Sequence, residues 1–157
     1  VPFLGAGAKL FSSLREYSAH WWFNGPPFIA LSDFLGDATV ARRLLAAGGI
    51  AFALAAAARE RDLARYVYLV IGCMLVVSPT VYPWYLLWIM PLLCLFPNRA
   101  WLAFSGLVML SYGVWDVFNA TGEWFVPTWL LALEYVPFYL LLLAGLSRSK
   151  QRAWAPA

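Results

Sequence analysis

Charged side chains are scarce in this sequence. Only 12% of its 157 residues are Asp, Glu, Lys or Arg, whereas 63% are hydrophobic. A soluble domain is about half apolar and about a quarter charged, so this composition excludes an ordinary soluble protein. The formal net charge of +3 is small and the basic residues are scattered, which argues against nucleic acid as a partner. The sequence therefore predicts a polytopic membrane protein, or a piece of one, with the lipid bilayer as its surroundings.

Several motifs that carry chemistry are absent as well. There is no glycine-rich phosphate loop, no dinucleotide fingerprint and no GxSxG nucleophile elbow. His20 is the single histidine, and one histidine cannot make a typical zinc site without Cys or carboxylate partners nearby. No cluster of carboxylates indicates a metal elsewhere. The sequence thus predicts no metal and no cofactor, and it leaves His20 as an interfacial hydrogen-bonding group or a substrate contact.

Apolar runs of helical length fill most of the chain. We expect an all-α membrane helix bundle of about five transmembrane spans, at about 38–58, 66–78, 84–96, 101–118 and 125–146. Asp37 is a plausible N-cap of the first span. An amphipathic helix at 10–22 and a short surface helix at 28–35 precede the spans. The expected organisation is the tail of an upstream span and an outer interfacial segment (1–37), the five-span bundle (38–146) and a basic cytoplasmic tail (147–157).

The second and third spans are short for a bilayer core of about 30 Å, which normally needs roughly 20 residues. A single kinked helix over 66–96 is the alternative. Two spans place the basic loop at 59–65, the loop at 97–100 and the basic tail on one side. The opposite loops then hold no basic residue. The positive-inside rule favours two spans, with the C-terminus in the cytoplasm of a multi-pass protein of the plasma or inner membrane.

The stretch SPTVYPWYLLWIMP, residues 78–91, interrupts the apolar region with prolines and aromatic residues. We expect a rigid turn on the outer side, with Tyr82, Trp84 and Tyr85 at the membrane interface. Aromatic faces stack on sugar rings, and a nearby cation could hold a phosphate, for which Arg15 is the best-placed outer arginine. The alternative is an ordinary aromatic belt, with Arg15 contacting lipid headgroups.

Glu134 lies about ten residues into the fifth expected span. An ionisable residue within a membrane helix is a functional-site hypothesis by default, because a charge there is costly. The alternative is a structural hydrogen bond inside the bundle. The sequence leaves both possibilities open.

Two motifs together resemble the C-terminal half of GT-C-type integral membrane glycosyltransferases, and the bacterial mannosyltransferase-like group in particular. The first is an outer loop of the form Y-x-x-x-W-x-F-N, and the second is an S-P-x-x-x-P-W-Y turn. The matching residues are Tyr17, Trp21, Phe23 and Asn24 in the first motif, and Ser78, Pro79, Pro83, Trp84 and Tyr85 in the second.

This resemblance implies the transfer of a sugar, such as mannose, from a polyprenyl-phosphate donor to a glycan or glycolipid acceptor on the outer membrane face. It implies that Tyr82, Trp84 and Tyr85 line the cavity and that His20, Trp21 and Asn24 are loop contacts. The catalytic carboxylate of such enzymes usually lies in an early outer loop, so we expect it in a missing N-terminal half.

Two other hypotheses remain at this stage. A transporter or lipid flippase half would use Glu134 as its coupling group, with helices broken at Pro91 and Pro137. A non-catalytic membrane subunit would pack through its first span, which is rich in Ala and Gly.

Overall fold

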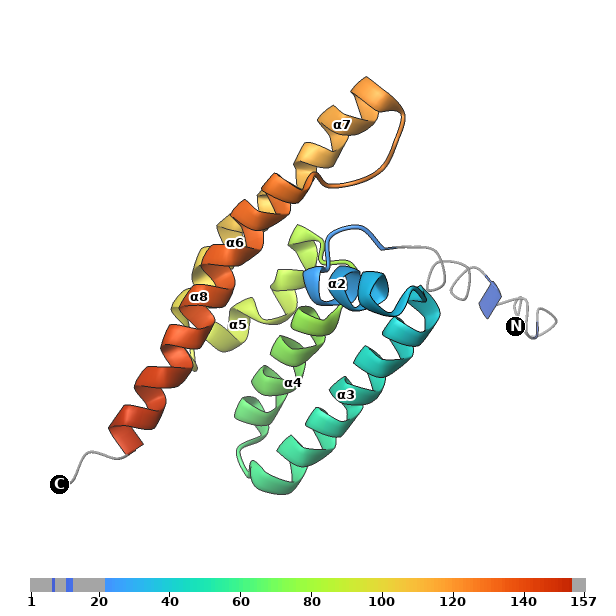
Figure 1. The fold of residues 1–157 in the computed structure, drawn as a ribbon. Coiled ribbons are helices and arrows are strands. Elements are labelled where there is room, and N and C mark those ends of the chain that lie inside the picture. The colour runs from blue at the N-terminus through green and yellow to red at the C-terminus, as the bar shows by residue number, and fades with distance from the viewer. Residues whose placement is uncertain (1–6, 8–10, 13–21, 154–157) are drawn as a thin grey trace.

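The computed structural model describes residues 7, 11–12 and 22–153, without the side chains of 146–153. All regular elements of this part of the chain are helices, which confirms the all-α prediction (Figure 1). They are α2 (Pro26–Leu35), α3 (Ala38–Arg59), α4 (Leu63–Val77), the 3₁₀ helix η2 (Pro83–Trp88), α5 (Met90–Leu93), α6 (Arg99–Leu107), the 3₁₀ helix η3 (Val108–Gly113), α7 (Val114–Thr121) and α8 (Thr128–Ala153).

Three helices are long and apolar enough to cross a membrane. They are Ala38–Arg59, the continuous run of α6, η3 and α7 over Arg99–Thr121, and the Thr128–Gly145 part of α8. The helix α8 does not end at 146, where the last span was expected to end, but continues to Ala153 into the basic segment.

Polar side chains cap the N-termini of three helices. The carboxylate of Asp37 accepts hydrogen bonds from the backbone N–H groups of Thr39 and Val40, at 2.7 and 3.0 Å, so its predicted N-cap role is confirmed. Asp62 caps α4 and Asn98 caps α6 in the same manner. Each cap satisfies backbone donors that the first turn of a helix leaves without intrahelical partners.

The helices α3 and α4 form an antiparallel hairpin, and α2 packs across its open end (Figure 1). Gly49 of α3 lies against α4, where a Cβ would come 3.7 Å from Cγ2 of Val77. An ion pair between Arg65 Nε and Glu60 Oε2, at 3.1 Å, joins the first turn of α4 to the α3–α4 loop, with Arg65 exposed and Glu60 partly buried. The hairpin therefore places the ends of α2 and α4 beside the start of α3.

The second pair consists of α8 and the α6–η3–α7 run, which lie antiparallel along most of their length (Figure 1). Trp101 and Phe138 rings lie 4.8 Å apart, and Phe104 and Tyr135 rings 5.0 Å apart. These side chains belong to a buried cluster that also includes Leu75 of α4 and residues of η2 and α5. One continuous apolar core therefore joins the two helix pairs.

The expected third span, 84–96, differs from the prediction. It does not form a regular α-helix but the 3₁₀ helix η2 followed by the four-residue α5. Pro91 is the physical reason, because it lacks the N–H group that a continuous helix over these residues needs, whereas Pro83 begins η2 at a position where no intrahelical N–H bond is needed. Leu86, Ile89 and Leu93 are nevertheless buried in the central cluster, so this irregular segment is packed inside the protein.

Candidate functional site

A fully buried amide joins two distant segments of the chain. The side chain of Asn24 donates a hydrogen bond from Nδ2 to the carbonyl oxygen of Val81, at 2.8 Å. Its Oδ1 accepts one from the N–H of Val81, at 2.7 Å. The N–H of Gly25 also donates to the carbonyl oxygen of Pro79, at 3.1 Å. We call this arrangement the Asn24 clamp, since it fixes the 22–25 segment on the turn that precedes η2.

Glycine is required beside the clamp because the two backbones approach closely. A Cβ on Gly25 would collide with the carbonyl oxygen of Ser78 and come within 2.8 Å of backbone atoms of Pro79. Ser78 stabilises the same turn, because its hydroxyl donates to the carbonyl oxygen of Thr80 at 2.5 Å. The sequence NGPP at 24–27 therefore supplies the clamp, the close approach and, through its prolines, the first turn of α2.

The clamp assembles a continuous line of aromatic rings, which we call the aromatic row. Tyr82 and Trp84 stack at 4.4 Å with 9° between their planes, and Tyr85 and Trp88 stack at 4.8 Å with 11°. Phe23 connects Tyr82, at 5.1 Å, to Trp124, at 6.5 Å. The complete row consists of Trp88, Tyr85, Trp84, Tyr82, Phe23, Trp124, Trp115 and Phe118.

The row combines anchored and accessible rings. Phe23 is buried, Tyr82 and Tyr85 are half-buried, and Trp84 and Trp88 are each about half exposed. The row follows η2, the 22–25 segment and the end of the α7–α8 hairpin, and we call this end of the molecule the aromatic end. Flat, exposed rings held by stacked neighbours are a rigid platform for an apolar or sugar face.

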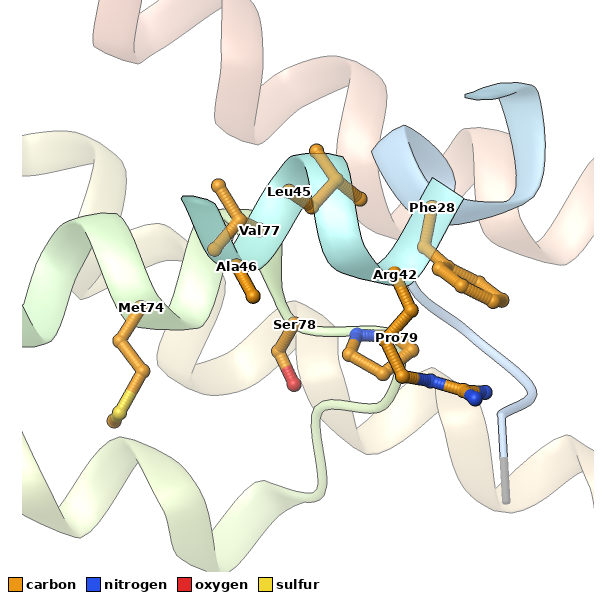
Figure 2. A pocket seen from close by; sticks show the side chains of 8 residues that line it. All are labelled: Phe28, Arg42, Leu45, Ala46, Met74, Val77, Ser78 and Pro79. Carbon is orange, nitrogen blue, oxygen red and sulfur yellow. The ribbon is translucent and has the colours of Figure 1, made fainter. Parts of the chain in front are cut away.

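A pocket of about 260 Å³ lies next to the clamp, between α3 and α4 (Figure 2). Its walls are Phe28, Leu45, Ala46, Met74, Val77 and Pro79, with Arg42 and Ser78 as its polar members. The guanidinium of Arg42 lies at the Phe28 and Pro79 end, with its Cζ 5.3 Å from the centre of the Phe28 ring, and Met74 lies at the other end (Figure 2). The Nε and Nη2 atoms of Arg42 are buried, and no hydrogen bond to either is formed within the described structure.

Glu134 is also buried, with 0% of its side chain exposed. Neither of its carboxyl oxygens has a hydrogen-bond partner in the described structure, and the same is true of the hydroxyl of the adjacent Tyr135. Glu134 lies one turn of α8 from Leu130 and one turn from Phe138, both of which pack toward α6 and η3. It is therefore inside the helix pair, beneath the aromatic end.

The site residues predicted from the sequence lie in different parts of the fold. Tyr82, Trp84 and Tyr85 come together in the aromatic row, whereas Glu134 lies apart inside the α8 pair. Asn24 uses its amide oxygen and nitrogen on the backbone of Val81. The predictions for Arg15, His20 and Trp21 lie outside the described residues.

Arg42, Trp115 and Trp124 belong to these features but were not among the residues predicted for the site. A signal for Arg42 was present, because Arg42 and Arg43 stand in the first turns of the first span, on the side where basic residues were expected to be rare. The contacts of Trp124 with Phe23 and of Trp115 with Trp124 are formed only by the fold. Within the described residues, no group of three or more His, Cys, Asp or Glu could hold a metal ion. In comparisons with known proteins, no family model, no curated protein and no solved structure matches this chain.

Proposed function

We propose that this chain is part of an integral membrane glycosyltransferase that moves a sugar from a polyprenyl-phosphate donor to a glycan or glycolipid acceptor. The observation that carries the proposal is the aromatic row beside the Asn24 clamp. Two stacked pairs, Tyr82 with Trp84 and Tyr85 with Trp88, place two half-exposed indole rings at one end of an apolar bundle. Their faces suit a sugar ring that is delivered from the membrane by its lipid.

The same proposal assigns roles to the predicted residues. Tyr82 and Tyr85 position the tryptophans, and Trp84 with Trp88 forms the sugar platform. Asn24 acts indirectly, because its amide holds the turn that carries the platform. Arg15, His20 and Trp21 belong to the preceding segment and are proposed as further contacts at the same end. The general base is proposed to come from another part of the protein, as the resemblance implies.

We also propose that the chain crosses the membrane five times, with the C-terminus in the cytoplasm. The helix α4 leads to the aromatic end, and α6 leads to it again through η3 and α7. The chain must therefore return between them, through η2, α5 and the residues that follow. Irregular backbone is tolerated at membrane depth where it is buried in protein, and Leu86, Ile89 and Leu93 are buried here.

This topology has a direct test. Single cysteines would be placed at Glu123 and Arg61 in a background where Cys73 and Cys94 are replaced by serine. A membrane-impermeant maleimide added to intact cells should label position 123 and leave position 61 unlabelled. Labelling of both positions, or of position 61 alone, would contradict the five-span topology.

The activity test compares two tryptophans that are both exposed. Trp84→Ala removes part of the platform, and Trp129→Ala is the matched control, because Trp129 lies on α8 and is 64% exposed. Both changes are made in the full-length protein, and transfer of radiolabelled sugar from a polyprenyl-phosphate donor is measured in membranes. Loss of about 1–1.5 kcal/mol of ring stacking should lower transfer about five- to tenfold for Trp84→Ala alone. Equal activity of the two variants would contradict the proposal.

The transporter hypothesis is supported by one observation, the buried and unpartnered carboxyl group of Glu134. An acid in that position fits a proton-coupled mechanism, because protonation removes its charge from an apolar site. The test is proton-driven flux in proteoliposomes made with Glu134→Gln, which retains the shape of the side chain. Abolished flux with unchanged sugar transfer would favour the transporter over the glycosyltransferase. Unaltered flux would remove the residue on which the transporter hypothesis depends.

A further inference from the structure

The two ends of the pocket between α3 and α4 differ in position and in chemistry. Arg42 lies about one turn after the start of α3, and Ser78 and Pro79 directly follow the end of α4, so this rim is at the aromatic end. Ala46 and Met74 lie one turn further along their helices, away from that end. The pocket is thus cationic at its rim and apolar below it.

Arg42 needs an anionic partner that the described chain does not provide. Its Nε and Nη2 atoms are buried without a hydrogen bond, and the Phe28 ring accounts for only one side of the guanidinium. Two of the three guanidinium nitrogens are therefore removed from water without a partner, so an anion that accepts their hydrogen bonds would be favoured. Ser78 is no substitute, because its hydroxyl hydrogen is already donated to the carbonyl oxygen of Thr80.

The apolar lining of the pocket favours an anion that also carries alkyl groups. Its volume of about 260 Å³ equals roughly eight or nine times the volume of one water molecule in the liquid. Leu45, Ala46, Met74 and Val77 offer no hydrogen bond from their side chains, so water is poorly held there. Alkyl groups fill such a space favourably, at about 25 cal/mol per Å² of apolar surface removed from water.

The bilayer beside α3 contains molecules that combine an anionic headgroup with alkyl chains. Leu44, Ile50 and Leu54 of α3 are exposed, although α3 is long and apolar enough to cross a membrane. These side chains belong in contact with lipid, and the rim of the pocket is at the level of the aromatic row, where headgroups lie. A phospholipid beside α3 therefore has its phosphate near Arg42 and its chains at the depth of Met74.

We propose that the α3–α4 pocket binds one anionic phospholipid of the bilayer, with the phosphate on the guanidinium of Arg42 and part of one acyl chain in the apolar space. This proposal is argued from the geometry of the α3–α4 hairpin and does not depend on the glycosyltransferase proposal. It predicts a lipid that remains with the purified protein and that is selected by its headgroup charge.

Two changes test the two halves of the site. Arg42→Gln removes the cation, and the adjacent Arg43→Gln is its matched control, because Arg43 is exposed and does not line the pocket. Ala46→Phe, at an exposed position beside the apolar part of the pocket, fills that part without altering any charge. The full-length protein in nanodiscs is transferred to mild detergent, and bound lipid is counted by native mass spectrometry. The nanodiscs contain equal amounts of phosphatidylglycerol and phosphatidylcholine.

The unmodified protein and Arg43→Gln should retain one phosphatidylglycerol per chain, with little phosphatidylcholine. Arg42→Gln should lower that retention about tenfold, since a charge-assisted phosphate contact is lost. Ala46→Phe should lower it as well, while its thermal unfolding stays close to that of the unmodified protein. This last comparison separates a filled pocket from a misfolded hairpin.

Other outcomes would overturn the inference. Equal losses in Arg42→Gln and Arg43→Gln would indicate diffuse attraction by surface charge rather than a site. Binding of glycerol 3-phosphate as strong as that of the lipid would identify a site for free phosphate. Retention of added farnesyl phosphate with no phosphatidylglycerol would assign the pocket to a prenyl-phosphate ligand instead.

Discussion

Replacing Asn24 by alanine tests whether the aromatic end depends on one buried side chain. Asn24 is 0% exposed, and it forms both of its hydrogen bonds with Val81, which is 1% exposed. The change removes two hydrogen bonds between segments that lie 57 positions apart in the chain. It leaves the N–H and C=O groups of Val81 buried without these partners.

The expected loss of stability follows from the N–H and C=O groups of Val81. A buried backbone group that loses its partner costs about 1–3 kcal/mol, so the two together cost about 2–6 kcal/mol. For a protein of this size, 1 kcal/mol lowers the unfolding temperature by about 2–4 °C. We therefore expect Asn24→Ala to unfold about 4–24 °C lower than the unmodified protein.

The assay is thermal unfolding in detergent micelles, combined with hydrogen exchange of the peptide that contains residues 79–82. The N–H of Val81 should exchange faster in Asn24→Ala, because its acceptor is gone. Asn119→Ala is the matched control, since Asn119 is an exposed asparagine near the end of α7. It should change neither the unfolding temperature nor the exchange of that peptide.

An unfolding temperature within about 1 °C of the unmodified protein, with unchanged exchange at Val81, would refute the structural role. A stable Asn24→Ala that had nevertheless lost sugar transfer would restore the direct substrate contact that the resemblance implies. The experiment therefore separates the two roles of Asn24.

Three further changes test other contacts. Gly25→Ala should prevent the close approach to Ser78 and Pro79, and limited proteolysis should then cut near residue 25 in the variant alone. Phe104→Ala should lower the free energy of unfolding by about 3–5 kcal/mol, as measured by denaturant unfolding, because Phe104 is 1% exposed among the rings of the α6–α8 pair. Arg65→Gln should change the same quantity by less than about 1 kcal/mol, because Arg65 is exposed in its ion pair with Glu60.

Sequence patterns predicted the helices well where local chemistry determines them. The apolar runs gave α3, the continuous α6–η3–α7 helix and α8, and Asp37 marked the start of α3 through its capping geometry. The third expected span was different, because hydrophobicity alone does not distinguish an α-helix from other buried backbone. Its prolines were visible, but their structural effect depended on the cluster of α4, α6 and α8 that surrounds the segment.

The candidate site was less predictable, because it depends on contacts between distant segments. The sequence placed Tyr82, Trp84 and Tyr85 together, since they are neighbours in the chain. It put the 119–124 turn on the same outer side as the 22–25 segment, but no local pattern gave the contact between Trp124 and Phe23. The sequence suggested Arg15 as a contact for a phosphate and did not point to Arg42. Only the folded α3–α4 hairpin places Arg42 at the rim of an apolar pocket.

The irregular third segment explains why these features occur at one end of the molecule. A regular α-helix over 84–96 would also bring residues three and four positions apart to one face, but with 3.6 residues per turn they would not be directly aligned. The 3₁₀ helix η2 has about three residues per turn, so Tyr85 and Trp88 fall on the same side and stack at 4.8 Å. On the buried side, Leu86 and Ile89 repeat at the same interval and pack into the core. The prolines thus replace a conventional span with a buried segment that keeps its aromatic rings at the surface of the aromatic end.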